Sequence, residues 1–176
     1  MNSIYQEQLE RLHNEKEAML EELAQWSQDQ IGWKSDEESW NANQVVEHLV
    51  TSEFGTFQYL VKKTSSGFDG LESATEEHRE SSKKLNAALA SDQQWKAPPV
   101  LPQPQGDKEM DVWVNRWRGL SQKMGEWLEQ VPENTEEKLV FRHPLSGRLT
   151  LEQTMDFLIE HIVHHGHQLR RIKEKW

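Results

Sequence analysis

The sequence predicts an all-α protein, a four-helix bundle with a small additional helix and long crossover loops. Four long segments carry apolar residues at spacings near three and four, with polar residues between them, which is the pattern of an amphipathic helix. Proline and glycine gather in the segments between them, and the sequence offers no convincing pair of strands. Amphipathic helices bury their apolar faces most simply by packing against one another.

The N-terminal third of the chain predicts two long helices. The first covers residues 2–30, and residues 31–40 form a connection. A second helix begins at Asn41, because Asn41 and Gln44 have the spacing of a capping box, and it runs to about Lys63. The first helix is predicted from apolar side chains at Tyr5, Leu9, Leu12, Met19, Leu23 and Trp26.

The middle of the chain predicts a short helix, a loop and a long helix. Residues 73–90 are mostly Glu, Ser, Lys and Ala, so this helix is expected at the periphery. Residues 96–107 are rich in proline and form a loop, because proline fixes φ and lacks the amide donor. Residues 108–130 predict a further helix through the apolar positions Val112, Trp113, Trp117, Leu120, Met124, Trp127 and Leu128.

The C-terminal part predicts the last long helix. Residues 139–149 contain a proline and a glycine and are expected to form an irregular crossover. Thr150 and Gln153 then have the spacing of a second capping box. The helix that starts there is expected to run to about Lys173.

Composition restricts the partners of this chain. We expect a single domain over residues 1–176, since about 100–200 residues make one domain. A net charge of -10, from 20 basic and 30 acidic residues, disfavours nucleic acid and anionic membranes as partners. No stretch approaches the ~20 apolar residues of a membrane span, and the first residues lack a secretory core, so we expect a cytoplasmic protein. The chain has no Cys, so a metal must be held by His, Asp, Glu or water.

Four of the eight histidines lie in EHIVHHGHQ, residues 160–168. His165 falls in a stripe of apolar residues separated by steps of four and three. His161 lies one turn earlier and about 40° to one side, so the two side chains can hold one ion from a single helix face. The stripe consists of Leu151, Met155, Leu158, Ile162, Leu169 and Ile172.

These histidines also fit structural roles that need no metal. The cluster can be a solvated helix end, where histidine suits the helix dipole, and a lone core histidine is usually just hydrogen-bonded. Two imidazoles buried together are costly unless their nitrogens are bound, and neutral imidazole is the commonest metal ligand. Gln168 lies on the same flank as His161. His164 lies outside the stripe and His167 points away, so both are expected at the surface.

A third ligand must come from another helix, and His48 is the best-placed candidate. It lies in a row of small and partly polar residues on the second predicted helix, as a site facing a cavity would: Val45, Leu49, Ser52, Thr56 and Tyr59. Glu47 and Glu53 are rival ligands on neighbouring faces of the same helix.

Three motifs resemble those of the DinB-like superfamily, which includes the YfiT-type bacillithiol transferases and metal-dependent hydrolases. WNANQVVEHL (residues 40–49) is similar to the opening of the family's second helix, and HPLSG (residues 143–147) is similar to its HPxxG crossover. EHIVHHGHQL (residues 160–169) is similar to its closing HxxxHxxQ helix. The family's commoner pattern has Arg-Gly after the last ligand, where this chain has Gly166 and His167.

The resemblance implies a four-helix bundle with one zinc or nickel ion per chain, held by His48, His161 and His165, and often a homodimer. The apolar residues on two sides of the second helix also favour a homodimer. Three neutral ligands leave the ion an open position, as in catalytic sites. An open ion can bind a thiol as a thiolate or activate a water.

The resemblance favours the first chemistry, the transfer of a low-molecular-weight thiol such as bacillithiol to an electrophile. His143 and Gln168 are then expected to orient the thiol. Two alternatives stay open: a metal-dependent hydrolase that activates a water, and a non-catalytic metal-binding stress protein.

Overall fold

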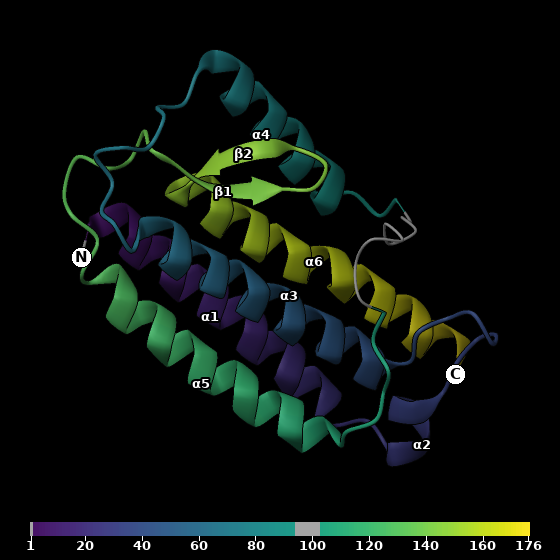
Figure 1. Cartoon of the computed structure of the whole chain (residues 1–176). Helices are drawn as coiled ribbons and strands as arrows, with labels where there is room; N and C mark the ends of the chain where they lie inside the picture. The colour runs from purple at the N-terminus through teal and green to yellow at the C-terminus, as the bar shows by residue number, and fades with distance from the viewer. Residues whose placement is uncertain (1, 94–102) are drawn as a thin grey trace.

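The four long helices α1, α3, α5 and α6 pack lengthwise around a common core (Figure 1). The computed structural model describes residues 2–93 and 103–176. Within these ranges α1 packs mainly on α6, and α3 packs on both α5 and α6. This arrangement confirms the predicted all-α bundle. The bounds are α1 Ser3–Leu23, α2 Gln28–Gly32, α3 Ala42–Thr64, α4 Glu76–Ala90, α5 Met110–Leu128, β1 Leu139–His143, β2 Gly147–Thr150 and α6 Leu151–Lys175.

Both predicted capping boxes form, and they fix the starts of α3 and α6. The Gln44 amide donates to Asn41 Oδ1 over 2.8 Å, and the Asn41 amide donates to Gln44 Oε1 over 3.2 Å. Thr150 and Gln153 exchange the same pair of bonds at the start of α6, over 3.0 and 3.2 Å. Such reciprocal bonds satisfy amides that the helix itself leaves unpaired, so the registers of α3 and α6 are set at their first turns.

The first helix is shorter than predicted. The prediction of one helix over residues 2–30 is wrong at its end, because α1 stops at Leu23 and a separate short helix, α2, follows. Ser27 starts α2 by accepting a hydrogen bond from the Gln30 amide. The buried Trp26 fits the apolar period of α1, but it lies in the turn between the two helices.

The predicted irregular crossover at residues 139–149 is also wrong, because it is a β-hairpin. β1 and β2 pair antiparallel, with Phe141 opposite Leu149 and His143 opposite Gly147. Gly147 has a φ of 78°, a left-handed conformation that glycine adopts without strain and that closes short hairpins. The hairpin packs against α3 and α6 through its buried side chains.

The peripheral helix α4 starts at Glu76, three residues later than predicted, and packs along α6. Ser82 is its one fully buried side chain among the described residues, which agrees with the expected peripheral position. Of the predicted loop over residues 96–107, the part up to residue 102 lies outside the described residues. Within the described ranges, no helix is long and apolar enough to cross a membrane.

Candidate metal centre

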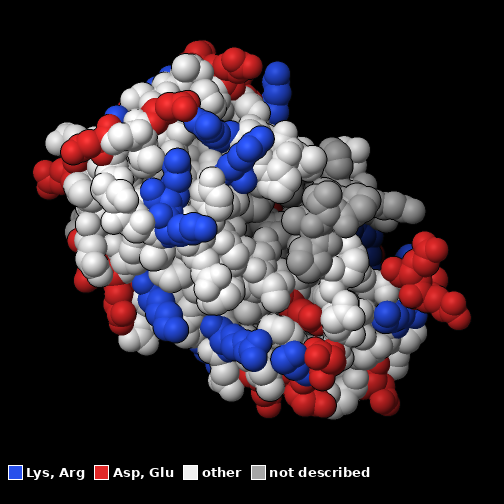
Figure 2. Space-filling model, in the orientation of Figure 1, with Lys and Arg blue, Asp and Glu red and all other residues white. Residues whose placement is uncertain are grey.

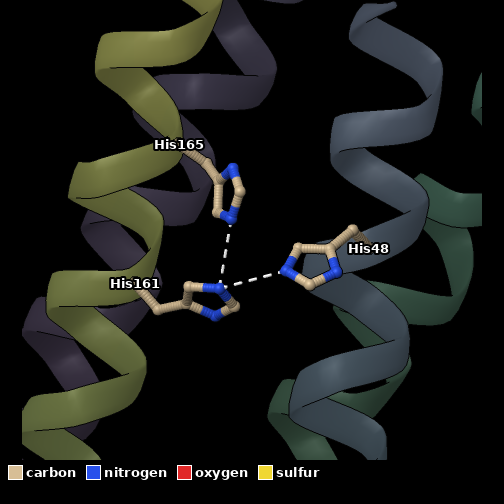
Figure 3. Close-up of side chains that lie close together, drawn as sticks. All are labelled: His48, His161 and His165. Atoms are coloured by element: carbon tan, nitrogen blue, oxygen red, sulfur yellow. Dashed lines mark hydrogen bonds between the residues drawn. The ribbon is translucent and has the colours of Figure 1, made fainter. Parts of the chain in front are cut away.

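Three histidines from two helices point toward one another between α3 and α6 (Figure 3). His161 Nε2 lies 3.1 Å from His48 Nε2 and 3.1 Å from His165 Nε2. All three ligand atoms lie within 4.8 Å of one another, and no other group of three or more His, Cys, Asp or Glu residues within the described ranges does this. The residues predicted as metal ligands therefore come together in the fold.

The helix geometry explains this convergence. His161 and His165 are one turn apart on α6 and face the same side, and α6 packs against α3, which carries His48. His48 and His165 are buried, whereas His161 keeps some exposed surface. The ring of His161 is nevertheless enclosed by the other two histidines and by Phe157.

Burial keeps all three imidazoles neutral. Desolvation lowers the pKa of His48 from 6.5 to about 4, and the neighbouring His164 adds to this. Desolvation, followed by the influence of His48, lowers the pKa of His165 to about 3. Desolvation and the two other histidines hold the pKa of His161 well below its ordinary value. Each ring therefore has a free lone pair near neutral pH, as a metal ligand requires.

The spacing of the nitrogens fits a divalent ion better than it fits hydrogen bonds alone. One ring nitrogen carries either a proton or a lone pair, so His161 Nε2 cannot make good in-plane hydrogen bonds to both of its neighbours. Two nitrogens bound to a zinc ion at about 2.05 Å with a tetrahedral angle lie about 3.3 Å apart. Two of the three separations, from His161 to His48 and from His161 to His165, are 3.1 Å and close to this value, and the nitrogens of His48 and His165 lie within 4.8 Å of each other.

Gln168 fixes the tautomer of His165. His165 Nδ1 donates to Gln168 Oε1 over 2.8 Å, so the proton of this imidazole lies on Nδ1 and its lone pair on Nε2, toward the other histidines. Metal-bound histidines commonly have such a second partner, which holds the ring in place. The contact joins Gln168 directly to the histidine cluster.

Aromatic rings enclose the histidines on two sides. The Trp40 ring lies 5.0 Å from that of His48 and stacks on His165 at 6.3 Å, between ring centres. Phe157 stacks on His161 at 5.4 Å. Neither Trp40 nor Phe157 is among the predicted site residues, although Trp40 directly precedes the cap of α3 and belongs to the first motif.

His143 lies one ring further away from the ligands. Its ring contacts Phe157 at 4.6 Å, and Phe157 in turn stacks on His161. His143 Nδ1 accepts hydrogen bonds from the amides of Leu145 and Ser146, so the proton of the neutral ring lies on Nε2. Burial lowers the pKa of His143 to about 4 and keeps it neutral.

The two rival carboxylates bind elsewhere. Glu47 accepts hydrogen bonds from the backbone amides of Gln105 and Gly106, at 3.0 and 2.7 Å. Glu53 forms a buried ion pair with Lys16, whose Nζ lies 2.6 Å away, and accepts a bond from Trp117 Nε1. Neither carboxylate belongs to the histidine cluster.

The expected surface positions of the two remaining histidines need correction. His164 is buried, and its Nδ1 donates to the carbonyl oxygen of Leu89 over 3.3 Å, because α4 covers this side of α6. His167 is half-buried, and its Nε2 is buried without a hydrogen-bond partner among the described residues.

A known family model matches this sequence. The model described as the DinB superfamily matches residues 8–169, which is most of the chain. No curated protein and no solved structure matches.

Proposed function

The chain belongs to the DinB superfamily, and from that premise we propose that it is a metal-dependent enzyme that transfers a low-molecular-weight thiol, of the bacillithiol kind, to an electrophile. The observation that carries this proposal is a cluster of three neutral imidazoles with no carboxylate in it. We propose zinc or nickel as the metal, one ion per chain. An ion held only by neutral ligands keeps its double charge and can hold the sulfur of a thiol deprotonated.

The carboxylates favour a thiol over water as the nucleophile. Hydrolysis at neutral pH commonly uses a nearby carboxylate as general base. Glu47 and Glu53, the acids closest to His48 in the sequence, are bound to backbone amides and to Lys16. A thiol held as a thiolate needs no such base. Since the chain has no Cys, the thiol must come from a cosubstrate.

We assign positioning roles to Gln168 and His143. Gln168 uses Oε1 to bind His165, which leaves its amide NH₂ to donate to a bound cosubstrate. His143 carries its proton on Nε2, because Nδ1 accepts from two backbone amides, so it can donate to an electron-rich group of a cosubstrate. Trp40 and Phe157 keep water away from the flanks of the ligand rings.

A spectroscopic titration tests this proposal. Adding bacillithiol or cysteine to the cobalt-substituted protein is expected to give a sulfur-to-cobalt charge-transfer band, and thiol conjugation to a generic electrophile is expected to require metal. The His161→Ala variant should lose both signals, whereas His167→Ala should keep them. If no band forms and an ester is hydrolysed without thiol, a hydrolase replaces this proposal. If neither reaction occurs with metal bound, a non-catalytic metal-binding stress protein replaces it.

We also propose a homodimer and a cytoplasmic location. Phe54 and Val61 lie two turns apart on one face of α3 and are 49 % and 40 % exposed, and such apolar surface favours a protein partner. Light scattering at micromolar concentration should give the dimer mass, and Phe54→Ser should lower it to the monomer mass. A monomeric wild type would exclude this arrangement. The cytoplasm keeps small thiols reduced, which suits the proposed reaction.

A further inference from the structure

A small basic pocket lies where the hairpin meets the C-terminal end of α3. It has a volume of about 170 Å³. Lys63 and Tyr59 of α3 line it on one side, and Arg142 and Arg148 of the hairpin line it on the other. In Figure 2, Lys and Arg side chains gather over the hairpin, although the molecule as a whole carries a net charge of -10.

The two arginines face each other across the hairpin, which is unfavourable when no anion is bound between them. Arg142 and Arg148 are direct cross-strand partners in the antiparallel pair, so their side chains leave the same face of the hairpin. Like charges in this position repel each other and weaken a hairpin. Glu72 offsets the charge of Arg148 but not that of Arg142, so an anion bound at Arg142 would remove the repulsion that remains.

The charges in the pocket do not cancel. Arg148 forms an ion pair with Glu72, at 2.6 Å. Neither Arg142 nor Lys63 forms an ion pair within the described part of the chain. Glu72 also lines the pocket, so its four charged side chains are Lys63, Arg142 and the paired Arg148 and Glu72, and two positive charges remain.

We propose that this pocket binds a small, doubly charged oxyanion, a phosphate group. The two uncompensated cations, Arg142 and Lys63, match the double negative charge of phosphate. A guanidinium group can also donate two parallel hydrogen bonds to two oxygens of one phosphate. The volume is below the ~300 Å³ of the smallest ordinary ligand sites, so the pocket takes the phosphate group alone or as the end of a small molecule.

The pocket is separate from the metal centre and independent of the proposed thiol chemistry. Tyr59 contacts Phe141, Phe141 stacks on Phe157, and Phe157 stacks on His161, with ring centres 5.4, 6.2 and 5.4 Å apart. These rings form a continuous chain of contacts between the two sites, so an anion in the pocket would not touch the ligand histidines.

Calorimetric titration of the full chain with inorganic phosphate, at constant ionic strength set by chloride, tests the proposal. We expect one phosphate per chain, competition by sulfate, and binding of singly charged acetate at least about tenfold weaker. Arg142→Gln should weaken phosphate binding by about tenfold or more, since each charge-assisted hydrogen bond lost costs about this factor. Arg116→Gln, which removes an exposed guanidinium from α5, is the matched control and should bind phosphate as the wild type does.

Two further measurements keep the test decisive. In chloride alone, Arg142→Gln should melt no lower than the wild type, because it relieves the repulsion with Arg148, so a loss of binding cannot be blamed on misfolding. His161→Ala should bind phosphate normally, which excludes a phosphate held at the metal centre. Phosphate binding that survives in Arg142→Gln, or acetate that binds as tightly as phosphate, would overturn the assignment.

Discussion

Lowering the pH of the metal-free protein should destabilise it through the three clustered histidines, His48, His161 and His165. Their pKa values are about 4 for His48, about 3 for His165 and well below the ordinary value for His161, against 6.5 for a free side chain. The unfolded chain therefore binds more protons, and stability present above pH ~6.5 is lost as the pH falls toward the folded-state pKa values. At about pH 5.5, one unit below the ordinary pKa, His48 and His165 each lower the free energy of unfolding by roughly 1.4 kcal/mol. Together with the buried His143, whose pKa is also about 4, they give about 4 kcal/mol, and His161 adds to this loss.

Urea denaturation with a chelator, at about pH 7.5 and about pH 5.5, measures this loss. Comparison with His161→Gln isolates the contribution of this histidine, because the variant should lose less free energy of unfolding between the two pH values than the wild type does. His13→Gln removes an exposed histidine of α1 and is the control, with the full wild-type loss expected. If His161→Gln loses as much stability as the wild type, the imidazole of His161 is not held neutral by the fold.

Three more outcomes follow from the structure. His165→Ala should abolish stoichiometric metal in elemental analysis after dialysis, and His167→Ala should not; equal loss from both would refute the ligand assignment. Chelation should leave the far-ultraviolet circular dichroism helical while lowering Tm by about 8–16 °C for an ion at ~1,000 times its Kd, and a fully unfolded chain would contradict this. Lys16→Met should cost about 3–5 kcal/mol in urea denaturation by leaving Glu53 buried and unpaired. The double variant Lys16→Met, Glu53→Leu should lose less free energy of unfolding than Lys16→Met alone, because no buried charge is left unpaired. If the double variant loses more, the ion pair itself stabilises the bundle.

Local sequence patterns were enough to predict the starts of two long helices and the histidines that come together in the fold. The capping boxes at Asn41 and Thr150 marked the starts of α3 and α6 to the residue. Apolar periodicity placed His165 in the core stripe and His161 beside it, and the fold brings both against His48. These features depend on a single helix face and its first turn, which a sequence displays directly.

The hairpin and the position of His164 depend on contacts between distant segments. β1 is only five residues long, and its strand is defined by pairing with β2. A signal was present in the sequence, since a short β-prone run before Pro144, followed by Gly147, is typical of a hairpin. His164 is buried because α4 covers it, and α4 has so few apolar residues that its sequence did not indicate which helix it covers.

The carboxylates of α3 connect the architecture to the chemistry of the site. Glu47 holds the backbone of residues 105–106 against α3, next to His48, and Glu53 balances Lys16 inside the bundle. Because each acid already has its partners, moving either one to the cluster would leave unpaired backbone amides or a buried lysine, both of which are costly. The fold thus keeps carboxylates out of the histidine cluster, and an ion bound there would retain the charge that the proposed thiolate binding requires. A carboxylate among the ligands would offset part of that charge and weaken the attraction for a thiolate.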